Sequence, residues 1–371
     1  MKKIKNIFII TLMCIMAVSL SSCTFKKSNN SKIAEKKVEK KEIKKFSVKD
    51  YFPFISNSNM VYEGKGSEYA SKEVYVDYIN GNRIQLREET SGTVIGKVLE
   101  VKDGELRVVF TKPEFYYRDN LMDAIDSGKI EPSMFMNDVI LKEPIKVGNK
   151  WSNYQGKTRE ITAIDKEVQI PIGKYKAVEV TTFDGDYKTR DYYVAELGHI
   201  KSEYDSKDMK VTTILSKIIH DKPVSQDVKF YYPKYYEESN TEGLVYKEEK
   251  TDFRTNMELK DIFEKNFKKK FEEDKNIMNV MSDNTSVNYI YLNDEEKKAC
   301  IDFSIEFVKE MNAGTTKESL VLQAVTNSVG NYYGVNKVYI SIDGRPYESG
   351  HIILTEKDYF QVDLKNCKKL E

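Results

Sequence analysis

The sequence predicts an α+β protein in which an antiparallel β-rich domain precedes a mixed α/β domain. From Tyr51 to Asp221, apolar and polar residues alternate with a period of two, which is typical of strands with one buried face. Beyond residue 222, short strand patterns alternate with patterns of helical period. We therefore expect a curved sheet or half-barrel, followed by a domain whose helices pack on one sheet face.

A leader precedes the folded regions. Lysines at the N-terminus are followed by an uncharged apolar run, Ile7–Leu20, which is too short to span a membrane and is typical of a secretory signal peptide. The run ends in Leu20-Ser21-Ser22-Cys23, which resembles the bacterial lipobox. The resemblance implies that residues 1–22 are a lipoprotein signal peptide and that Cys23 carries a diacylglycerol anchor with further acylation such as palmitate. The alternative is an ordinary secreted protein with an incidental cysteine.

Residues 23–50 are expected to form a basic, disordered tether. The first 50 residues carry 13 lysines and four acidic residues, whereas the whole chain balances 59 basic with 59 acidic residues. Lysines at helical spacing repel one another and oppose a helix. The segment could lie beside anionic lipid headgroups or act as a solvated spacer. The net charge of zero argues against nucleic acid as a partner.

Turn signals divide the β-rich domain, residues 51–221, into short strands. Asn80-Gly81 and Asp103-Gly104 are two-residue hairpin signals, and further glycine-containing turns follow at regular spacing. A single short helix is expected around residues 120–127. This order of elements predicts a meander of antiparallel strands.

Three sequence motifs, in this order, resemble those in the β-rich domain of many bacterial envelope lipoproteins. They are residues 143–151, residues 170–175 and residues 192–198, which contain proline, glycine and aromatic residues at similar spacings. The resemblance implies a fold and no particular chemistry. Trp151, the single tryptophan, could stack on a ligand, but we expect it in the core.

The second domain, residues 222–371, begins after Lys222-Pro223. The expected strands are residues 228–232, 244–253, 287–292, 300–303 and 338–342. Thr255 with Glu258, and Thr315 with Glu318, are predicted to be capping boxes that open two helices. Gly334 is expected to end the second of these helices.

Four motifs of this domain occur in a recognisable order. They are Ile301-Asp302-Phe303-Ser304, residues 312–318, residues 323–329 and residues 335–344, which ends in Asp343-Gly344. Together they resemble the GerMN domain over residues 228–353. The resemblance implies a fold similar to ring-building domains of secretion systems. It also implies an envelope lipoprotein of sporulation or spore germination, with protein partners, possible self-assembly and no catalytic activity.

Candidate catalytic residues are few. The histidines at positions 199, 220 and 351 lack the spacing of metal ligands, and no nucleophile or phosphate-binding motif is present. Cys300 is expected to be a structural thiol, and whether it pairs with Cys367 is left open. Asp302 and Asp343 are assigned to hydrogen bonds at a strand end and a turn. We expect no catalytic site, metal or cofactor.

The leading hypothesis is a non-enzymatic, lipid-anchored envelope protein on the extracytoplasmic face of the cell membrane. Its GerMN domain would mediate protein–protein assembly in sporulation or germination. The alternative is an envelope carrier or receptor that binds a lipid, a wall polymer or a small ligand through the β-rich domain. A wall hydrolase without a recognisable site is a third, weaker interpretation.

Overall fold

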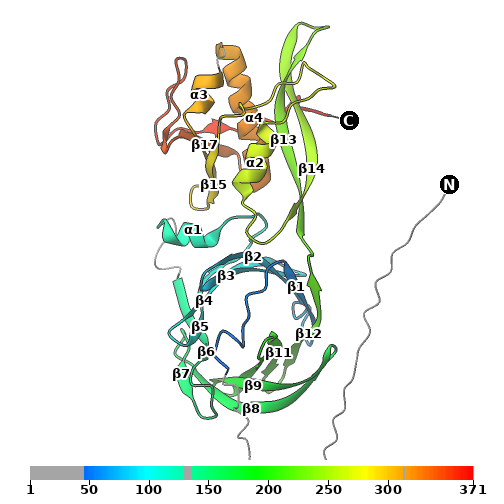
Figure 1. Ribbon diagram of the computed structural model, residues 1–371, viewed down its shortest axis with the longest axis vertical. Coiled ribbons are helices and arrows are strands. Elements are labelled where there is room, and N and C mark those ends of the chain that lie inside the picture. The colour runs from blue at the N-terminus through cyan, green and yellow to red at the C-terminus, as the bar shows by residue number, and fades with distance from the viewer. Residues whose placement is uncertain (1–45, 129–134, 312–313, 371) are drawn as a thin grey trace, which may run out of the picture. The chain divides into compact units, whose positions relative to one another are not determined.

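The computed structural model describes residues 46–128, 135–311 and 314–370. The predicted signal peptide, Cys23 and nearly all of the tether lie outside the described residues, as do residues 312–313 of the second GerMN motif. Within the described ranges, a large antiparallel sheet is followed by a region of smaller sheets and helices (Figure 1). The predicted α+β class is therefore confirmed.

The large sheet has twelve strands, built from two successive meanders. The first meander consists of β1 (Ser58–Lys65), β2 (Lys72–Asn80), β3 (Arg83–Thr90), β4 (Val94–Lys102), β5 (Glu105–Lys112) and β6 (Phe135–Lys142). The second consists of β7 (Lys150–Ser152), β8 (Thr158–Ile170), β9 (Gly173–Asp184), β10 (Tyr187–Val194), β11 (Gly198–Asp205) and β12 (Lys210–His220). The meanders meet where β1 pairs antiparallel with β12.

Pairing of β1 with β12 makes β6 and β7 the two edge strands, although they follow each other in the chain. The sheet therefore curls until these edges approach, and it is nearly closed in Figure 1. A half-barrel was the sequence-based expectation, and the observed sheet curves further. The turns at residues 81–82 and 103–104 have the positive φ values that two-residue hairpins require at Gly81, Asp103 and Gly104.

Side chains bridge the seam between the two edge strands. The indole Nε1 of Trp151 donates a hydrogen bond to the carbonyl oxygen of Val139 in β6 at 2.8 Å. Arg159 of β8 donates to the same oxygen at 2.6 Å and binds both carboxylate oxygens of Asp138 at 2.7 and 3.1 Å. These side chains satisfy a backbone group that an open edge would leave without a ladder partner. The core prediction for Trp151 is confirmed, since it is 9% exposed.

The inner face of the sheet carries the main apolar core of this part of the chain. Inward-facing valine, isoleucine, leucine and tyrosine side chains from both meanders form it. The segment before β1, residues 46–57, runs inside the curled sheet (Figure 1). Val48 of this segment is 1% exposed, and its N–H donates to Glu143 at 2.9 Å. The last residues of the predicted tether, 46–50, are thus part of the folded domain.

The outer face of β2, β3 and β4 is covered by the segment after β5. It contains α1 (Leu121–Asp126), which confirms the short helix predicted around residues 120–127 and which Asn120 caps through Asp123 N–H at 3.3 Å. A Cβ atom on Gly96 would lie 2.8 Å from Phe115 and 2.9 Å from Leu121. Glycine is needed here because the covering segment approaches the backbone of β4 closely.

The second region contains two further sheets and three helices. Its strands are β13 (Val224–Tyr236), β14 (Thr241–Phe253), β15 (Val287–Asn293), β16 (Lys298–Phe303), β17 (Lys337–Ile342), β18 (Arg345–Pro346), β19 (Phe360–Gln361) and β20 (Lys368–Lys369). Its helices are α2 (Leu259–Phe267), α3 (Glu306–Met311) and α4 (Thr315–Tyr333). One sheet has the order β13-β14-β20, and the other has β15-β16-β17-β18 with β19 beside β17.

Helix α4 packs between the β13–β14 hairpin and the sheet of β16 and β17. The hydroxyl of Ser328 accepts a hydrogen bond from Tyr231 N–H of β13 at 2.9 Å. One apolar core therefore joins the hairpin, the helix and the sheet. Gly334 ends α4 in the left-handed conformation, with φ of 67°, as predicted.

Both predicted capping boxes are wrong. Glu258 occupies the N-cap position of α2, but its side chain forms no capping hydrogen bond. The hydroxyl of Thr255 instead donates to the carbonyl of Val76 in β2 at 2.8 Å. The residue that caps α4 is Gly314, and Glu318 is 3% exposed and accepts a hydrogen bond from Tyr347 at 2.7 Å. Tertiary contacts take these side chains away from the local bonds that the sequence spacing suggested.

The GerMN motif residues have structural roles. The buried carboxylate of Asp302 accepts hydrogen bonds from Asn288 at 2.7 Å and from Gly344 N–H at 2.8 Å. Asn327 of α4 is also buried and accepts a hydrogen bond from Asp363 N–H at 2.9 Å. Asp302 therefore fixes the turn at Asp343-Gly344, which confirms the hydrogen-bonding role predicted for it.

Candidate functional site

The candidate site lies where the second region meets the outer face of the large sheet. The connector from β14 to α2, residues 254–258, runs along β2 at the bulge around Asp77. Asn256 N–H donates to the carbonyl of Asp77 at 2.9 Å, and Asn256 exchanges side-chain hydrogen bonds with the backbone of Ile79 at 2.7 and 3.1 Å. The bulge exposes backbone groups that the connector then satisfies.

A buried charge cluster holds this contact together. The carboxylate of Asp77 lies 3.2 Å from Arg118 and 3.0 Å from Arg87, and all three side chains are at most 2% exposed. Arg118 also donates to the carbonyls of Arg254 at 2.7 Å and Met257 at 2.8 Å. Asp77 offsets one of the two guanidinium charges, and backbone carbonyls accept hydrogen bonds from both arginines, which lowers the cost of burying the remaining positive charge.

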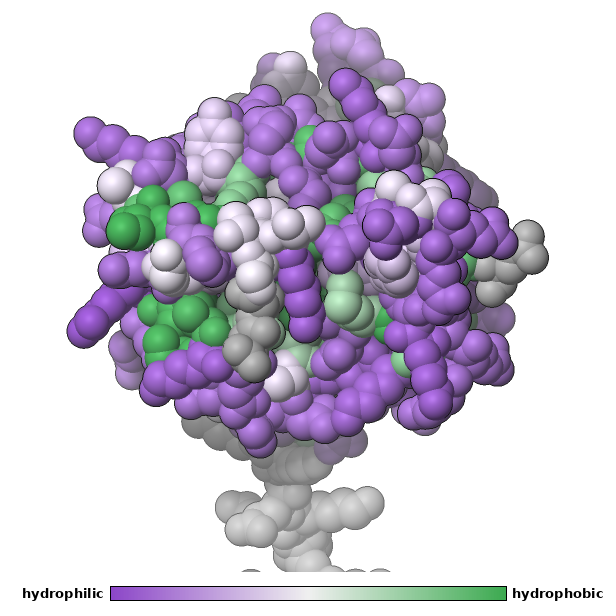
Figure 2. All heavy atoms as spheres, turned by 90° about the horizontal axis from the view of Figure 1, so that it is seen from above, coloured by the Kyte–Doolittle hydropathy of each residue, from purple (hydrophilic) through white to green (hydrophobic). Residues whose placement is uncertain are grey.

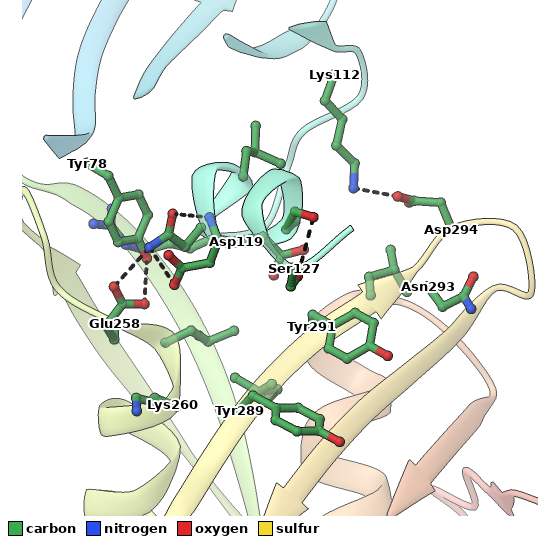
Figure 3. A pocket seen from close by; sticks show the side chains of 18 of the residues that line it. Tyr78, Lys112, Asp119, Ser127, Glu258, Lys260, Tyr289, Tyr291, Asn293 and Asp294 are labelled. Atoms are coloured by element: carbon green, nitrogen blue, oxygen red, sulfur yellow. Dashed lines mark hydrogen bonds and ion pairs between the residues drawn. The ribbon is translucent and has the colours of Figure 1, made fainter. Parts of the chain in front are cut away.

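Beside the cluster is a pocket of about 580 Å³, which we call the junction pocket. Its walls come from α1 and the end of β5 on one side and from β15 and the start of α2 on the other (Figure 3). Tyr78 and Glu258 lie at one end of the pocket, and the ion pair of Lys112 with Asp294 lies at the other (Figure 3). A volume of this size is within the range of ligand-binding sites.

Strand β15 is an edge strand whose outer side faces the junction pocket. Side chains meet three of its backbone groups. Lys260 donates to the carbonyl of Asn288 at 3.4 Å, Glu264 accepts from Val287 N–H at 2.9 Å, and the backbone of Leu292 hydrogen-bonds to Asp119. Backbone groups in this position could instead bond to an added strand. An added strand would have to replace these side-chain bonds.

The junction pocket has an excess of carboxyl groups. Five acidic and three basic residues line it: Asp119, Asp123, Glu258, Asp294, Glu295, Lys112, Arg118 and Lys260. Burial raises the pKa of Asp119 to about 6, against the opposing effects of Lys112 and of a hydrogen bond from Tyr333. Burial also raises the pKa of Glu258, and the charge of Asp123 adds to this effect. A cationic group in the pocket would stabilise the ionised forms of both carboxyls.

The face seen from above in Figure 2 is mostly hydrophilic, and its hydrophobic side chains gather in small patches. Large contiguous apolar patches are typical of surfaces that bind a permanent partner. Polar residues interrupt the apolar ones on this face. The edge of β15 is thus a better-defined candidate for recognition.

The cysteine and histidine residues considered in the sequence analysis do not come together in one site. Cys300 is buried in β16, and no disulfide joins it to Cys367. His199 contacts Asp191 at 3.1 Å, whereas His351 is exposed in the second region. Among the described residues, no cluster of three or more acidic, histidine or cysteine side chains could hold a metal ion.

In the same residues, no helix has the length and apolarity to cross a membrane. Cys23 lies outside the described residues.

Sequence reasoning missed the residues that build the junction pocket. Arg118 and Asp119 lie between β5 and α1, in a segment without periodic pattern or motif. One signal of this site was present in the sequence: Asp77 is an acidic residue within the apolar pattern of β2. A buried acid in a strand requires a charged or hydrogen-bonding partner. The identity of that partner depends on the tertiary fold.

Residues 229–348 match the Germane family, whose description is sporulation and spore germination. The recognition of a GerMN-type region is therefore confirmed for this part of the chain. None of the curated proteins compared with the chain matches it.

Several solved structures are similar to parts of the chain. The tandem GerMN domains of the sporulation protein GerM from Bacillus subtilis are 17% identical, with a TM-score of 0.28, over 38% of this chain and 45% of that one. A Bacteroides fragilis protein described as exported, with a YmcC-like fold, is 12% identical, with a TM-score of 0.28, over 45% of this chain and 98% of its own. A Clostridium perfringens protein described as a lipoprotein is 14% identical, with a TM-score of 0.24, over 38% and 93%. The match to GerM thus spans less than half of that chain.

Proposed function

We propose that this protein is a non-enzymatic component of the cell envelope and that its GerMN region assembles with a protein partner in sporulation or spore germination. The match of residues 229–348 to a family described by these two processes carries the proposal. The signal-peptide pattern and the lipobox ending at Cys23 support an extracytoplasmic, lipid-anchored location.

The junction pocket is the surface on which we place the partner. Strand β15 offers an edge on which an extended segment can form main-chain hydrogen bonds. Lys112 is engaged with Asp294 and Arg118 with Asp77. Neither forms an ion pair with Asp119 or Glu258, although the charge of Lys112 lowers the pKa of Asp119 and that of Arg118 lowers the pKa of Glu258, both against the effect of burial. A partner segment with lysine or arginine side chains would complement them.

A pocket-filling substitution tests this role in the organism. Ser127 is exposed at the end of α1 and lines the junction pocket, so Ser127→Trp should obstruct it without disturbing the core. The chromosomal gene is replaced by this variant or deleted. Heat-resistant spores are then counted, and germination is followed by the release of dipicolinic acid. We expect the variant to reproduce most of the defect of the deletion.

Asp126→Trp is the matched control, because Asp126 is an exposed neighbour in α1 that does not line the pocket. It forms a surface ion pair with Arg83, whose loss should cost less than about 1 kcal/mol. Normal spore formation and germination in the deletion strain would refute the function. A deletion defect that Ser127→Trp does not reproduce would refute only the assignment to the junction pocket.

A further inference from the structure

A second cavity lies on the inner face of the twelve-stranded sheet, and we call it the lumen cavity. It has a volume of about 320 Å³ and is lined by residues from β1 to β6 and from β10 to β12. This volume falls within the range of small-molecule sites. The junction pocket involves the outer face of the sheet, so the two sites are separate.

One end of the lumen cavity is apolar. The segment before β1 contributes Phe52, Pro53 and Ile55 there. The walls also contain aliphatic side chains from six strands: Met60, Val74, Val76, Ile84, Leu86, Leu99, Val108 and Ile218. A site with this lining favours a hydrocarbon group, because burial of apolar surface contributes roughly 25 cal/mol per Å².

Toward the opposite end, charged residues continue the same inward-facing rows. Lys72 precedes Val74 in β2, Glu88 follows Leu86 in β3, and Lys97 precedes Leu99 in β4. A hydrocarbon tail alone would not require these charges. Along β2, β3 and β4, the lining therefore changes from apolar to charged in the strand direction.

The three charged side chains form one group. Both lysine Nζ atoms contact the same oxygen of Glu88, Lys72 at 3.2 Å and Lys97 at 2.8 Å. Burial alone would raise the pKa of Glu88, but the two ammonium groups lower it to about 2. The group thus carries one net positive charge, and each ammonium has further N–H donors that Glu88 does not use.

Asp138 and Asp191, the other two carboxylates that line the lumen cavity, each contact a basic side chain. Asp138 binds Arg159 through both carboxylate oxygens, and Asp191 contacts His199 at 3.1 Å. Burial would raise the pKa of Asp191, but the hydrogen bond and charge of His199 lower it. Lys72 and Lys97 are therefore the two lysines that line the cavity, and they share one carboxylate, that of Glu88.

We propose that the lumen cavity binds a single-chain amphiphile, with its hydrocarbon tail against the aliphatic walls and its anionic head on Lys72 and Lys97. The head is a carboxylate or a phosphate, since both accept hydrogen bonds from ammonium groups. This site lies in the β-rich domain and does not depend on the role proposed for the GerMN region.

Binding is measured with the full-length gene product in amphipol and with dansyl-labelled undecanoic acid as the fluorescent probe. Palmitate and lysophosphatidylglycerol compete in separate arms, which distinguishes a free fatty acid from a lipid with a phosphate head. Inorganic phosphate is the third competitor. We expect saturable probe binding that at least one lipid displaces and that inorganic phosphate leaves unchanged.

Variants test the two ends of the cavity separately. Lys97→Gln should weaken probe binding about five- to tenfold, because a charge-assisted hydrogen bond is lost at a partly exposed site. Lys201→Gln is the control, since Lys201 pairs with Glu203 in β11 and does not line the cavity. Leu86→Trp should abolish binding by filling the apolar end, provided that circular dichroism shows a folded protein.

The proposal is overturned by any of three results. The first is no saturable binding by the wild-type chain. The second is displacement by inorganic phosphate as effective as displacement by the lipids, which would indicate a simple anion site. The third is equal affinity of wild type, Lys97→Gln and a folded Leu86→Trp, which would place the probe elsewhere on the protein.

Discussion

Arg118 and Asp77 form an ion pair of 3.2 Å across the contact between the β2 strand and the segment before α1, and both side chains are almost fully buried. Arg118 also reaches the carbonyls of Arg254 and Met257, which belong to the connector into α2. One side chain therefore ties the large sheet to the start of the GerMN helices. The junction pocket lies directly beside it.

Arg118→Met should destabilise the protein strongly. The substitution keeps much of the side-chain volume but leaves the carbonyls of Arg254 and Met257 without this donor and removes one of the two cations of Asp77. Asp77 keeps Arg87 as its partner, so the cost comes mainly from the carbonyl groups left without a donor, at about 1–3 kcal/mol each. Urea unfolding followed by circular dichroism measures the loss. Arg83→Met, which removes a more exposed pair with Glu100, should cost about 1 kcal/mol or less. Equal costs for the two variants would contradict a special role for Arg118.

Asp119 should make the stability depend on pH in a defined direction. Its pKa is raised by burial to about 6, so the folded protein binds a proton more tightly than the unfolded chain does. Stability from this group is therefore greatest below about pH 4 and falls as pH rises to 6. Asp119→Asn removes this dependence, and its stability relative to wild type should increase by about 2 kcal/mol between pH 4 and pH 7.

The measurement for Asp119 is the difference in urea unfolding free energy between variant and wild type at several pH values. The difference cancels the contributions of other acids, such as Glu88, whose lowered pKa acts in the opposite direction. A difference for Asp119→Asn that stays constant between pH 4 and pH 7 would contradict this prediction.

Local patterns predicted most of the elements but not their assembly. The hairpin at Asp103-Gly104 and the end of α4 at Gly334 follow from backbone preferences that neighbouring residues specify, and both were predicted correctly. Thr255 was misassigned as a helix cap because its partner is Val76, which lies 179 residues away in the chain. The lumen and junction sites depend on such distant contacts. Their residue types were visible in the sequence, but their proximity was not.

Trp151→Phe should weaken the seam of the large sheet. The variant keeps an aromatic side chain in the core but loses the hydrogen bond from the indole to Val139, at a cost of about 1–2 kcal/mol. Arg159 still donates to the same carbonyl, so the loss should not reach the value of a fully unsatisfied group. Urea unfolding is followed by circular dichroism, since Trp151 is the single tryptophan. Tyr154→Phe, at an exposed neighbouring position, should be close to neutral, and an equal loss in both variants would contradict the role in the seam.

Cys23→Ala should abolish lipid attachment. If the lipobox interpretation is correct, the thiol of Cys23 is the acceptor of the diacylglycerol, and two acyl chains are needed for stable anchoring. Cells expressing the full-length gene are labelled with an alkyne analogue of palmitate, and the incorporated label is measured on the purified protein. We expect label in the wild type and none in Cys23→Ala, with more of the variant released to the medium. Cys14→Ala, within the predicted signal peptide, should be labelled like the wild type. Label that persists in Cys23→Ala would show that the chain is acylated elsewhere or that the protein is held by another anchor.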